Sequence, residues 1–265
     1  MRRRAIRVPL LFPLVLAVLA GAHAADPDLT LRRAIVTASL RSTRDQCLKS
    51  APSPTCEPHP EDGYVIIKDL CGKTQRLLLP TEPVHGESVT GIEAPILLTA
   101  DAPNYWQAAW AAGSRLIGGD IMLGLNAKAG RSADLFHIHI DKINPGFRSA
   151  LAAELEGRAI PAPGGAPLSG LHLFGHSYDL WRVKSLEPNL FRTLPPDRQQ
   201  RMACQSLAVT SDGEGGFLVL NGAVAPVDSC EPRSGLTDNG NTDRLEVDDH
   251  GAAADAYPAA HCRAP

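Results

Sequence analysis

The sequence is short of aromatic side chains, of net positive charge and of long apolar runs. Aromatic residues make up 5% of the 265 residues, and the 26 Lys and Arg are outnumbered by 29 Asp and Glu. A chain with this balance lacks the basic surface that nucleic-acid binding requires, so we expect no nucleic-acid partner. The longest apolar run, Val8–Ala20, contains Pro13 and is shorter than the ~20 residues that span a bilayer.

Residues 1–24 have the pattern of a secretory signal. Four arginines lie within the first seven residues, the apolar run follows, and Ala22-His23-Ala24 has the small residues that signal peptidase recognises. We expect cleavage after Ala24, and retention as a membrane anchor is the alternative. The remaining residues, 25–265, have a length typical of one domain, which we expect to end in an irregular acidic tail over about 228–265.

The six cysteines include no C-x2-C pair, which argues against a zinc module. An even number of cysteines behind an export signal favours disulfides. We predict one pair, Cys47 with Cys56, which closes a short proline-containing loop. The other pairings stay open, and we expect the tail to be held in place only if Cys230 and Cys262 are bridged.

Periodicity and turn residues predict an α+β fold with antiparallel strand pairs and separate helices. Helices are expected over 27–42, from Pro103 with Asp101 as its cap, and from Asn144 to Leu155. Strands are expected over 64–69, 75–79, 121–126, 135–142, 171–174, 178–183, 206–210 and 217–220. Residues 47–60 and 161–167 have loop composition, and the second segment is a candidate boundary between two halves.

The clearest chemical signal is the alternation Leu-Phe-His-Ile-His-Ile-Asp at residues 135–141. Because successive side chains of a strand point to opposite faces, His137, His139 and Asp141 are expected on one face and the apolar residues between them on the core face. Three titratable groups on one surface are suited to acting on a single substrate.

A turn at residues 126–132 precedes this strand and offers donors for a phosphate. Asn126, Arg131 and Ser132 supply side-chain donors, and the backbone N–H groups around Gly130 supply more. A phosphate held there would lie within reach of His137, whose imidazole is a competent nucleophile towards phosphorus. A neighbouring backbone carbonyl would hold the Nδ1 proton and leave Nε2 to attack.

This pattern resembles the histidine triad superfamily of nucleotide hydrolases and transferases. That superfamily has a His-φ-His-φ-His motif behind a Gly-x-Ser turn and a strand-end Asn. In this sequence His137 takes the position of the middle, nucleophilic histidine and His139 that of the third, while Leu135 stands in the first position. The resemblance implies a histidine-triad-like antiparallel sheet with flanking helices.

The wider chain is similar to the exported bacterial CDP-diacylglycerol pyrophosphatases. The similarity lies in the Cys47/Cys56 loop, in His261-Cys262 and in segments 63–70, 75–81, 103–110, 130–145 and 175–185. It implies hydrolysis of CDP-diacylglycerol to CMP and phosphatidate through a nucleotidyl-histidine, without a metal or other cofactor. It also implies a role in phospholipid metabolism, in the periplasm and near the inner membrane surface.

Further substrate-binding residues follow mainly from the same resemblance. They are Lys68 and Gln75 in the first half and His176, Tyr178 and Arg182 in the second, where strand spacing sets the last three on one face. Without the resemblance, each is by default a solvated or packing residue.

Other interpretations of the histidine pair remain open at this point. His137 and His139 can belong to a solvated strand face, or they can form a metal pair with Asp141, His172 or His176 as a third ligand. Two further function classes are a nucleotidyl transferase with an acceptor other than water and a non-catalytic nucleotide or lipid binder.

Overall fold

A computed structural model describes residues 27–69, 74–81, 90–163 and 166–223, together with Cys230 and Leu245. Within these residues nine strands form one sheet in the order β1-β2-β3-β5-β4-β8-β9-β7-β6, and every neighbouring pair is antiparallel. The predicted α+β class with antiparallel pairing and flanking helices is confirmed. The predicted signal sequence, Cys262 and most of the tail lie outside the described residues.

The strands are β1 (Cys56–His59), β2 (Tyr64–Lys68), β3 (Arg76–Pro80), β4 (Ile121–Leu125), β5 (Ile138–Lys142), β6 (Leu168–Leu173), β7 (His176–Val183), β8 (Gln205–Ser211) and β9 (Phe217–Ala223). The helices are α1 (Pro27–Leu48), α2 (Tyr105–Leu116), α3 (Pro145–Leu155) and the short α4 (Pro196–Gln199), with 3-10 turns η1 (Pro95–Leu98), η2 (Leu190–Thr193) and η3 (Met202–Cys204).

One face of the sheet is covered by α2 and has a continuous apolar core. Trp106 and Ala109 of α2 are fully buried against this face, whose strand residues include Ile66, Leu78, Leu123, Ile138, Ile140, Leu207, Val209 and Val219. Gly113 allows the helix to approach closely, because a Cβ there would lie 2.6 Å from Cγ2 of Ile140. This apolar layer fixes the position of β5 from the α2 side, opposite to the face on which His139 lies.

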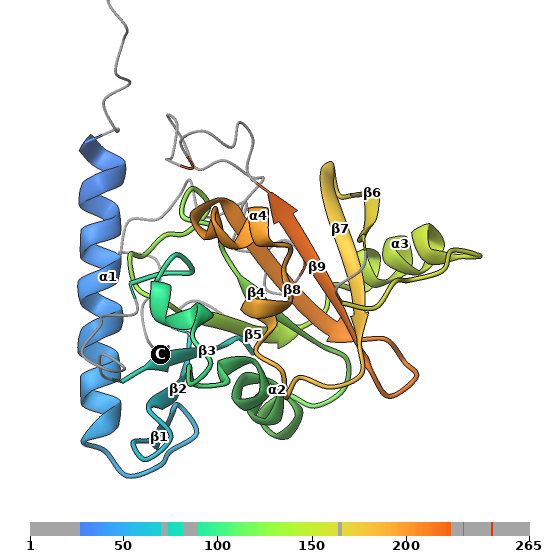
Figure 1. Ribbon diagram of the computed structural model, residues 1–265. Helices are drawn as coiled ribbons and strands as arrows, with labels where there is room; N and C mark the ends of the chain where they lie inside the picture. Colours follow the sequence, from blue (N-terminus) through green and yellow to red (C-terminus); the bar gives the residue numbers. More distant parts are fainter. Residues whose placement is uncertain are drawn as a thin grey trace, which may run out of the picture.

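The opposite face has two separate apolar clusters. At one end α1 packs on β1–β3, where Leu40 and Cys47 join Val65, Ile67, Leu77 and Leu79. At the other end α3 packs with β6, β7 and β9, where Phe147 and Leu151 join Leu171, Leu173, Leu180, Leu218 and Leu220. Figure 1 shows the two helices at these opposite ends of the sheet. Strands β5, β4 and β8 lie between them.

Several predicted boundaries are wrong in ways that have a physical reason. β1 lies within the predicted loop 47–60; it is an edge strand, where Pro58 interrupts no central ladder. The cap of α2 is Asn104 rather than Asp101, since the Asn104 side chain accepts a hydrogen bond from the N–H of Gln107 at 3.3 Å.

Three further differences concern element lengths and the sheet. α1 continues to Leu48, six residues past its predicted end, because its C-terminal part packs on β1 and β2. β5 begins at Ile138 rather than residue 135, so His137 lies just before the strand. The 161–167 loop does not divide the sheet, since the strands before and after it belong to the same nine.

The disulfides join the helices and the tail to this sheet. The predicted pair Cys47–Cys56 is confirmed, with a Cα–Cα distance of 5.6 Å. Cys230 pairs with Cys204, the last residue of η3, so the Cys230–Cys262 bridge that the sequence leaves open does not form. The tail is also anchored by packing, because Leu245 is fully buried and its carbonyl accepts a hydrogen bond from the N–H of Asn144 at 2.9 Å. No helix within the described residues is long and apolar enough to span a bilayer.

Candidate active site

The two predicted histidines lie side by side on the face between the α1 and α3 clusters. Their ring centroids are 4.8 Å apart, and the side chains are 4% and 6% exposed for His137 and His139. Two imidazoles this close and this buried make up a polar centre between two apolar clusters. The solvated strand face considered above is therefore wrong.

His137 is oriented by a backbone carbonyl. Its Nδ1 lies 2.7 Å from the carbonyl oxygen of Leu135, which can only accept, so Nδ1 carries the proton. The lone pair of the neutral ring is then on Nε2. Leu135, which stands where the histidine triad has its first histidine, thus supports the ring through its main chain.

His139 has the opposite tautomer. Its Nδ1 lies 3.1 Å from Nε2 of Gln75, and the amide nitrogen donates, so Nδ1 accepts and the ring proton is on Nε2. Gln75 is fully buried, and the pairing of Leu77 with His139 sets it on the same face of the sheet. The structure therefore brings Gln75 to the histidines, as predicted. The two rings present one lone pair and one N–H.

Asp141 is fully buried on the same strand. Its Oδ1 accepts hydrogen bonds from Thr74 Oγ1 at 2.5 Å and from the N–H of Lys142 at 2.8 Å. This carboxylate ties β5 to the beginning of β3. No group of three or more His, Cys, Asp or Glu close enough for a metal is found in the described part of the chain.

Small and polar residues continue the site across the sheet. Gly124 of β4 pairs with His139, and Ala208 of β8 pairs with Gly124. Gly124 and Ala208, the neighbours of His139 across the sheet, are therefore small. Asn126 directly follows β4 and His137 directly precedes β5, and both residues are buried. The binding of substrate by Asn126 stays a prediction.

The predicted phosphate turn is largely bonded within the protein. The N–H groups of Gly130 and Arg131 both donate to the carbonyl of Ala127, at 2.9 and 3.1 Å. Ser132 is exposed at the end of the turn. The binding of substrate by Gly130 and Ser132 stays a prediction, with Ser132 the member that faces solvent.

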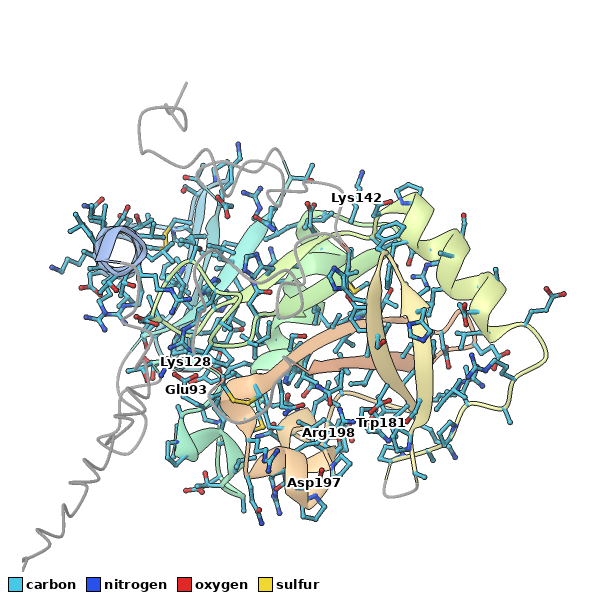
Figure 2. All side chains as sticks on the ribbon, turned by 90° about the horizontal axis from the view of Figure 1, so that it is seen from above. Glu93, Lys128, Lys142, Trp181, Asp197 and Arg198 are labelled. Atoms are coloured by element: carbon cyan, nitrogen blue, oxygen red, sulfur yellow. A yellow bond between two sulfur atoms is a disulfide. The ribbon has the colours of Figure 1, made fainter. Side chains whose placement is uncertain are left out.

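Arg131 is buried between two carboxylates. Nη1 and Nη2 donate to Glu93 at 2.5 and 2.7 Å, and Nε and Nη2 donate to Asp134 at 3.0 and 2.8 Å. Burial by itself would lower the pKa of Arg131, but the hydrogen bonds and charges of Glu93 and Asp134 outweigh it and raise the pKa. In Figure 2 the labels of Glu93 and Lys128 fall close together, well away from that of Lys142. The donors of this guanidinium are therefore used in hydrogen bonds within the protein.

Lys68 is not brought to the histidines. It pairs with Arg76, and Arg76 pairs with Ile140, so all three point to the α2 face. His139 points to the other side. Ile67 points to the histidine side, and the next residue of a strand points to the opposite side. The side chain of Lys68 therefore lies across the sheet from the predicted site.

His176, Tyr178 and Arg182 do share one face of β7, as their spacing predicted. Tyr178, however, packs in the α3 cluster, 6.5 Å from the Phe147 ring, and Arg182 pairs with Glu214 at 2.9 Å and Asp212 at 3.3 Å. β7 is four strand positions from β5, about 19 Å along the sheet. Their role in binding stays a prediction. His172, on β6, lies one strand further away.

Sequence reasoning missed Glu93 and Thr74. Each comes from a segment with no periodic pattern and reaches its partner only through the fold. No sequence signal distinguishes them from other loop residues.

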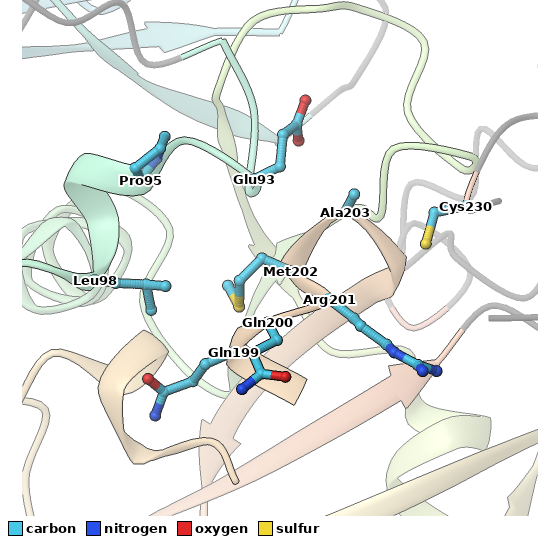
Figure 3. A pocket seen from close by; sticks show the side chains of 9 residues that line it. All are labelled: Glu93, Pro95, Leu98, Gln199, Gln200, Arg201, Met202, Ala203 and Cys230. Atoms are coloured by element: carbon cyan, nitrogen blue, oxygen red, sulfur yellow. The ribbon is translucent and has the colours of Figure 1, made fainter. Parts of the chain in front are cut away.

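A cavity of about 540 Å³ lies near Arg131 but does not include the histidines (Figure 3). Its lining comes from η1, the α4–η3 segment and Cys230, and it touches the site only through Glu93. A second cavity, about 470 Å³, lies between the β1–β2 turn and the start of α2. Neither is placed for chemistry at His137, which faces the sheet surface between α1 and α3.

The fold and the paired histidines define an α+β protein with a histidine-centred site. The chain belongs to the CDP-diacylglycerol pyrophosphatase family, whose model matches residues 34–238. A CDP-diacylglycerol pyrophosphatase of Yersinia pestis is 36% identical over 186 residues, which cover 64% of this chain and 67% of that protein.

Solved structures offer a more distant likeness. A crystal structure of yeast Ap4A phosphorylase Apa2 in complex with AMP has a TM-score of 0.41 and 13% identity, and covers 68% of this chain. A second crystal structure of yeast Ap4A phosphorylase Apa2 has a TM-score of 0.38 and 12% identity, over 66% of this chain. The match spans 64% and 62% of the two phosphorylase chains, less than two thirds of their length. The family membership rests on the sequence matches.

Proposed function

We propose that this protein hydrolyses the pyrophosphate of CDP-diacylglycerol, releasing CMP and phosphatidate. The observation that carries the proposal is the hydrogen bond from His137 Nδ1 to the carbonyl of Leu135 at 2.7 Å. It leaves the lone pair on Nε2, which is the nucleophile that this chemistry needs. Membership of the family supplies the substrate class.

In the proposed first step, His137 Nε2 attacks the phosphorus that is bonded to the cytidine ribose. The new bond is N–P, and the bond that breaks joins this phosphorus to the bridging oxygen, which leaves with phosphatidate. Water then attacks the same phosphorus, the N–P bond breaks, and CMP leaves with the ring restored. Such reactions depend mainly on positioning and charge stabilisation.

His139 takes the supporting role in this proposal. With Gln75 bonded to its Nδ1, its Nε2–H is the donor for the phosphoryl or leaving oxygen. Asn126 is assigned as the donor to a second phosphoryl oxygen, because it directly follows β4, whose Gly124 pairs with His139. The lone pair and the N–H of neighbouring rings thus act on the two sides of one phosphorus.

The compartment is part of the proposal. The basic and apolar N-terminal residues favour export, and the Cys47–Cys56 and Cys204–Cys230 disulfides suit an oxidising periplasm. Because the substrate is a lipid, the protein would work at the membrane surface. Fractionation of expressing cells, with the mature N-terminus sequenced, tests export and cleavage after Ala24.

Turnover with a defined set of substrates tests the activity. The purified protein is incubated with CDP-diacylglycerol in mixed micelles, with water-soluble CDP-alcohols and with dinucleotides, and CMP release is measured. We expect CMP and phosphatidate from the lipid substrate. Release of CMP from none of them refutes the proposal, and transfer of cytidylate to an added alcohol instead of water identifies a transferase.

A further inference from the structure

The loop before the nucleophile is held by an ion-pair cluster that the mechanism above does not use. Glu93, Arg131 and Asp134 form what we call the Glu93–Arg131–Asp134 clamp, in which all three guanidinium nitrogens donate to carboxylate oxygens. Asp134 directly precedes Leu135, whose carbonyl orients His137. The clamp therefore acts on the residue next to the one that holds the ring.

The clamp joins three parts of the chain. Glu93 lies just before η1, Arg131 follows the β4 turn, and the N–H of Asp134 donates to Thr37 Oγ1 of α1 at 2.7 Å. Arg33 of α1 adds an ion pair with Asp134 at 3.9 Å. The loop 131–135 is thus fixed on two sides, by η1 and by α1.

Arg131 is poorly placed to bind a substrate phosphate. Its side chain is 5% exposed, and its single positive charge is already balanced by the carboxylates of Glu93 and Asp134. A phosphate approaching it would meet these two negative charges first. The paired guanidinium is better suited to holding the loop than to holding an anion.

Gly91 provides independent evidence that the contact is tight. A Cβ on Gly91 would lie 1.8 Å from Nη1 of Arg131 and 2.5 Å from Oε2 of Glu93. Its φ is outside the left-handed region, so alanine could adopt this backbone, and the clamp is what excludes it.

We propose that Arg131 is a positioning residue, which with Glu93 and Asp134 holds the Leu135 carbonyl in place for His137 Nδ1. This inference rests on the proposed function and deepens it. Arg131 then acts through His137 and contacts no substrate atom.

The test compares three variants that loosen the clamp in different ways. Arg131→Lys keeps the positive charge, but the ammonium group cannot make the paired hydrogen bonds to both Glu93 and Asp134. Glu93→Gln removes one partner's charge, and Gly91→Ala pushes the guanidinium aside without changing any charge. For each we expect kcat to fall about 10- to 100-fold, because a small misplacement of a reacting group has this effect, while KM changes less than about twofold.

A second readout observes the ring without any substrate. With 15N-histidine labelling, the long-range couplings of His137 report which ring nitrogen carries the proton. The wild type should show a proton on Nδ1, and the three variants a mixture of tautomers. A matched control is Arg148→Lys. Arg148 of α3 makes a similar two-pronged ion pair with Asp120, away from the loop 131–135. The control variant should leave kcat and the His137 signal unchanged.

Each outcome decides the inference. A raised KM with an unchanged His137 tautomer in Arg131→Lys would show a substrate donor and overturn the positioning role. Normal kcat in Glu93→Gln and Gly91→Ala would also overturn it. If Arg131→Lys does not fold, these other two variants carry the same prediction. A wild type without CDP-diacylglycerol hydrolysis refutes the proposed function alone, and the tautomer signal still decides whether the clamp orients the ring.

Discussion

The two faces of the sheet differ, because one holds the continuous core and the other holds the candidate site. The α2 face carries one continuous apolar core from β2 to β9, which holds the fully buried side chains of Trp106, Ile138 and Ile140. The opposite face is apolar only under α1 and α3, and between them it carries His137, His139 and Asp141. The site lies where the second core is interrupted.

The difference shows how one strand serves both purposes. β5 alternates isoleucines towards α2 with His139 and Asp141 towards the other side, so the continuous core holds the strand while its other face is polar. The polar side is stabilised by specific bonds, such as Gln75 to His139 and Thr74 to Asp141. Substitutions on the two faces should therefore have separate effects.

The largest effect is expected for His137→Ala. Removal of the nucleophile should lower kcat by at least about 10,000-fold, equivalent to ~5 kcal/mol of activation free energy. The melting temperature should stay close to that of the wild type, since the ring bonds to one backbone carbonyl of a loop that is separately clamped. Rates are measured with CDP-diacylglycerol, and a variant that keeps even a tenth of the wild-type rate excludes His137 as nucleophile.

His139→Ala should be the next most damaging change. Loss of its Nε2–H should lower kcat by about 100- to 1,000-fold, the range for one positioned proton or hydrogen-bond donor. Gln75→Leu, which removes the bond that sets the tautomer, should have a smaller effect of about 10-fold. Steady-state kinetics of both variants test this order, and a larger effect for Gln75 would require another role for it.

Ile140→Ala tests the α2 face on the same strand. This side chain is fully buried, and its truncation should lower the free energy of unfolding by about 3 kcal/mol. Because it points away from the histidines, kcat of the folded protein should change less than about threefold. Urea unfolding and kinetics at low temperature measure the two quantities. A loss of turnover as large as that of His139→Ala would mean that the faces are not independent.

Arg182→Ala should have the smallest effect. Arg182 is on the histidine side of the sheet, but it is partly exposed, four strands away, and paired with Glu214 and Asp212. We expect less than about 1 kcal/mol of lost stability and less than a twofold change in kcat/KM. A marked rise in KM would instead support its predicted role in substrate binding and extend the site to β7.

Much of the fold and the centre of the site can be predicted from local patterns. The alternation at 135–141 predicts the direction of each side chain, and the predicted strands before and after the 126–132 turn do pair with each other. The failures have physical causes. Lys68 is suggested by the resemblance alone, whereas its strand position directs it to the α2 face, and β1 has no strand-like pattern because proline is tolerated at an edge. The ion pair of Arg131 is also absent from any local pattern, because its partner Glu93 lies 38 residues earlier in the chain.

By itself the sequence determined which residues of a strand can share a face, because side-chain direction in a strand depends only on position along it. It also determined that His137 follows a turn. Only the tertiary structure decided which strands are neighbours. That choice puts Gln75 against His139 across 64 residues, closes the Glu93–Arg131–Asp134 clamp, and leaves β7 at a distance from β5. Strand order results from packing the two faces as a whole, so no local pattern contains it.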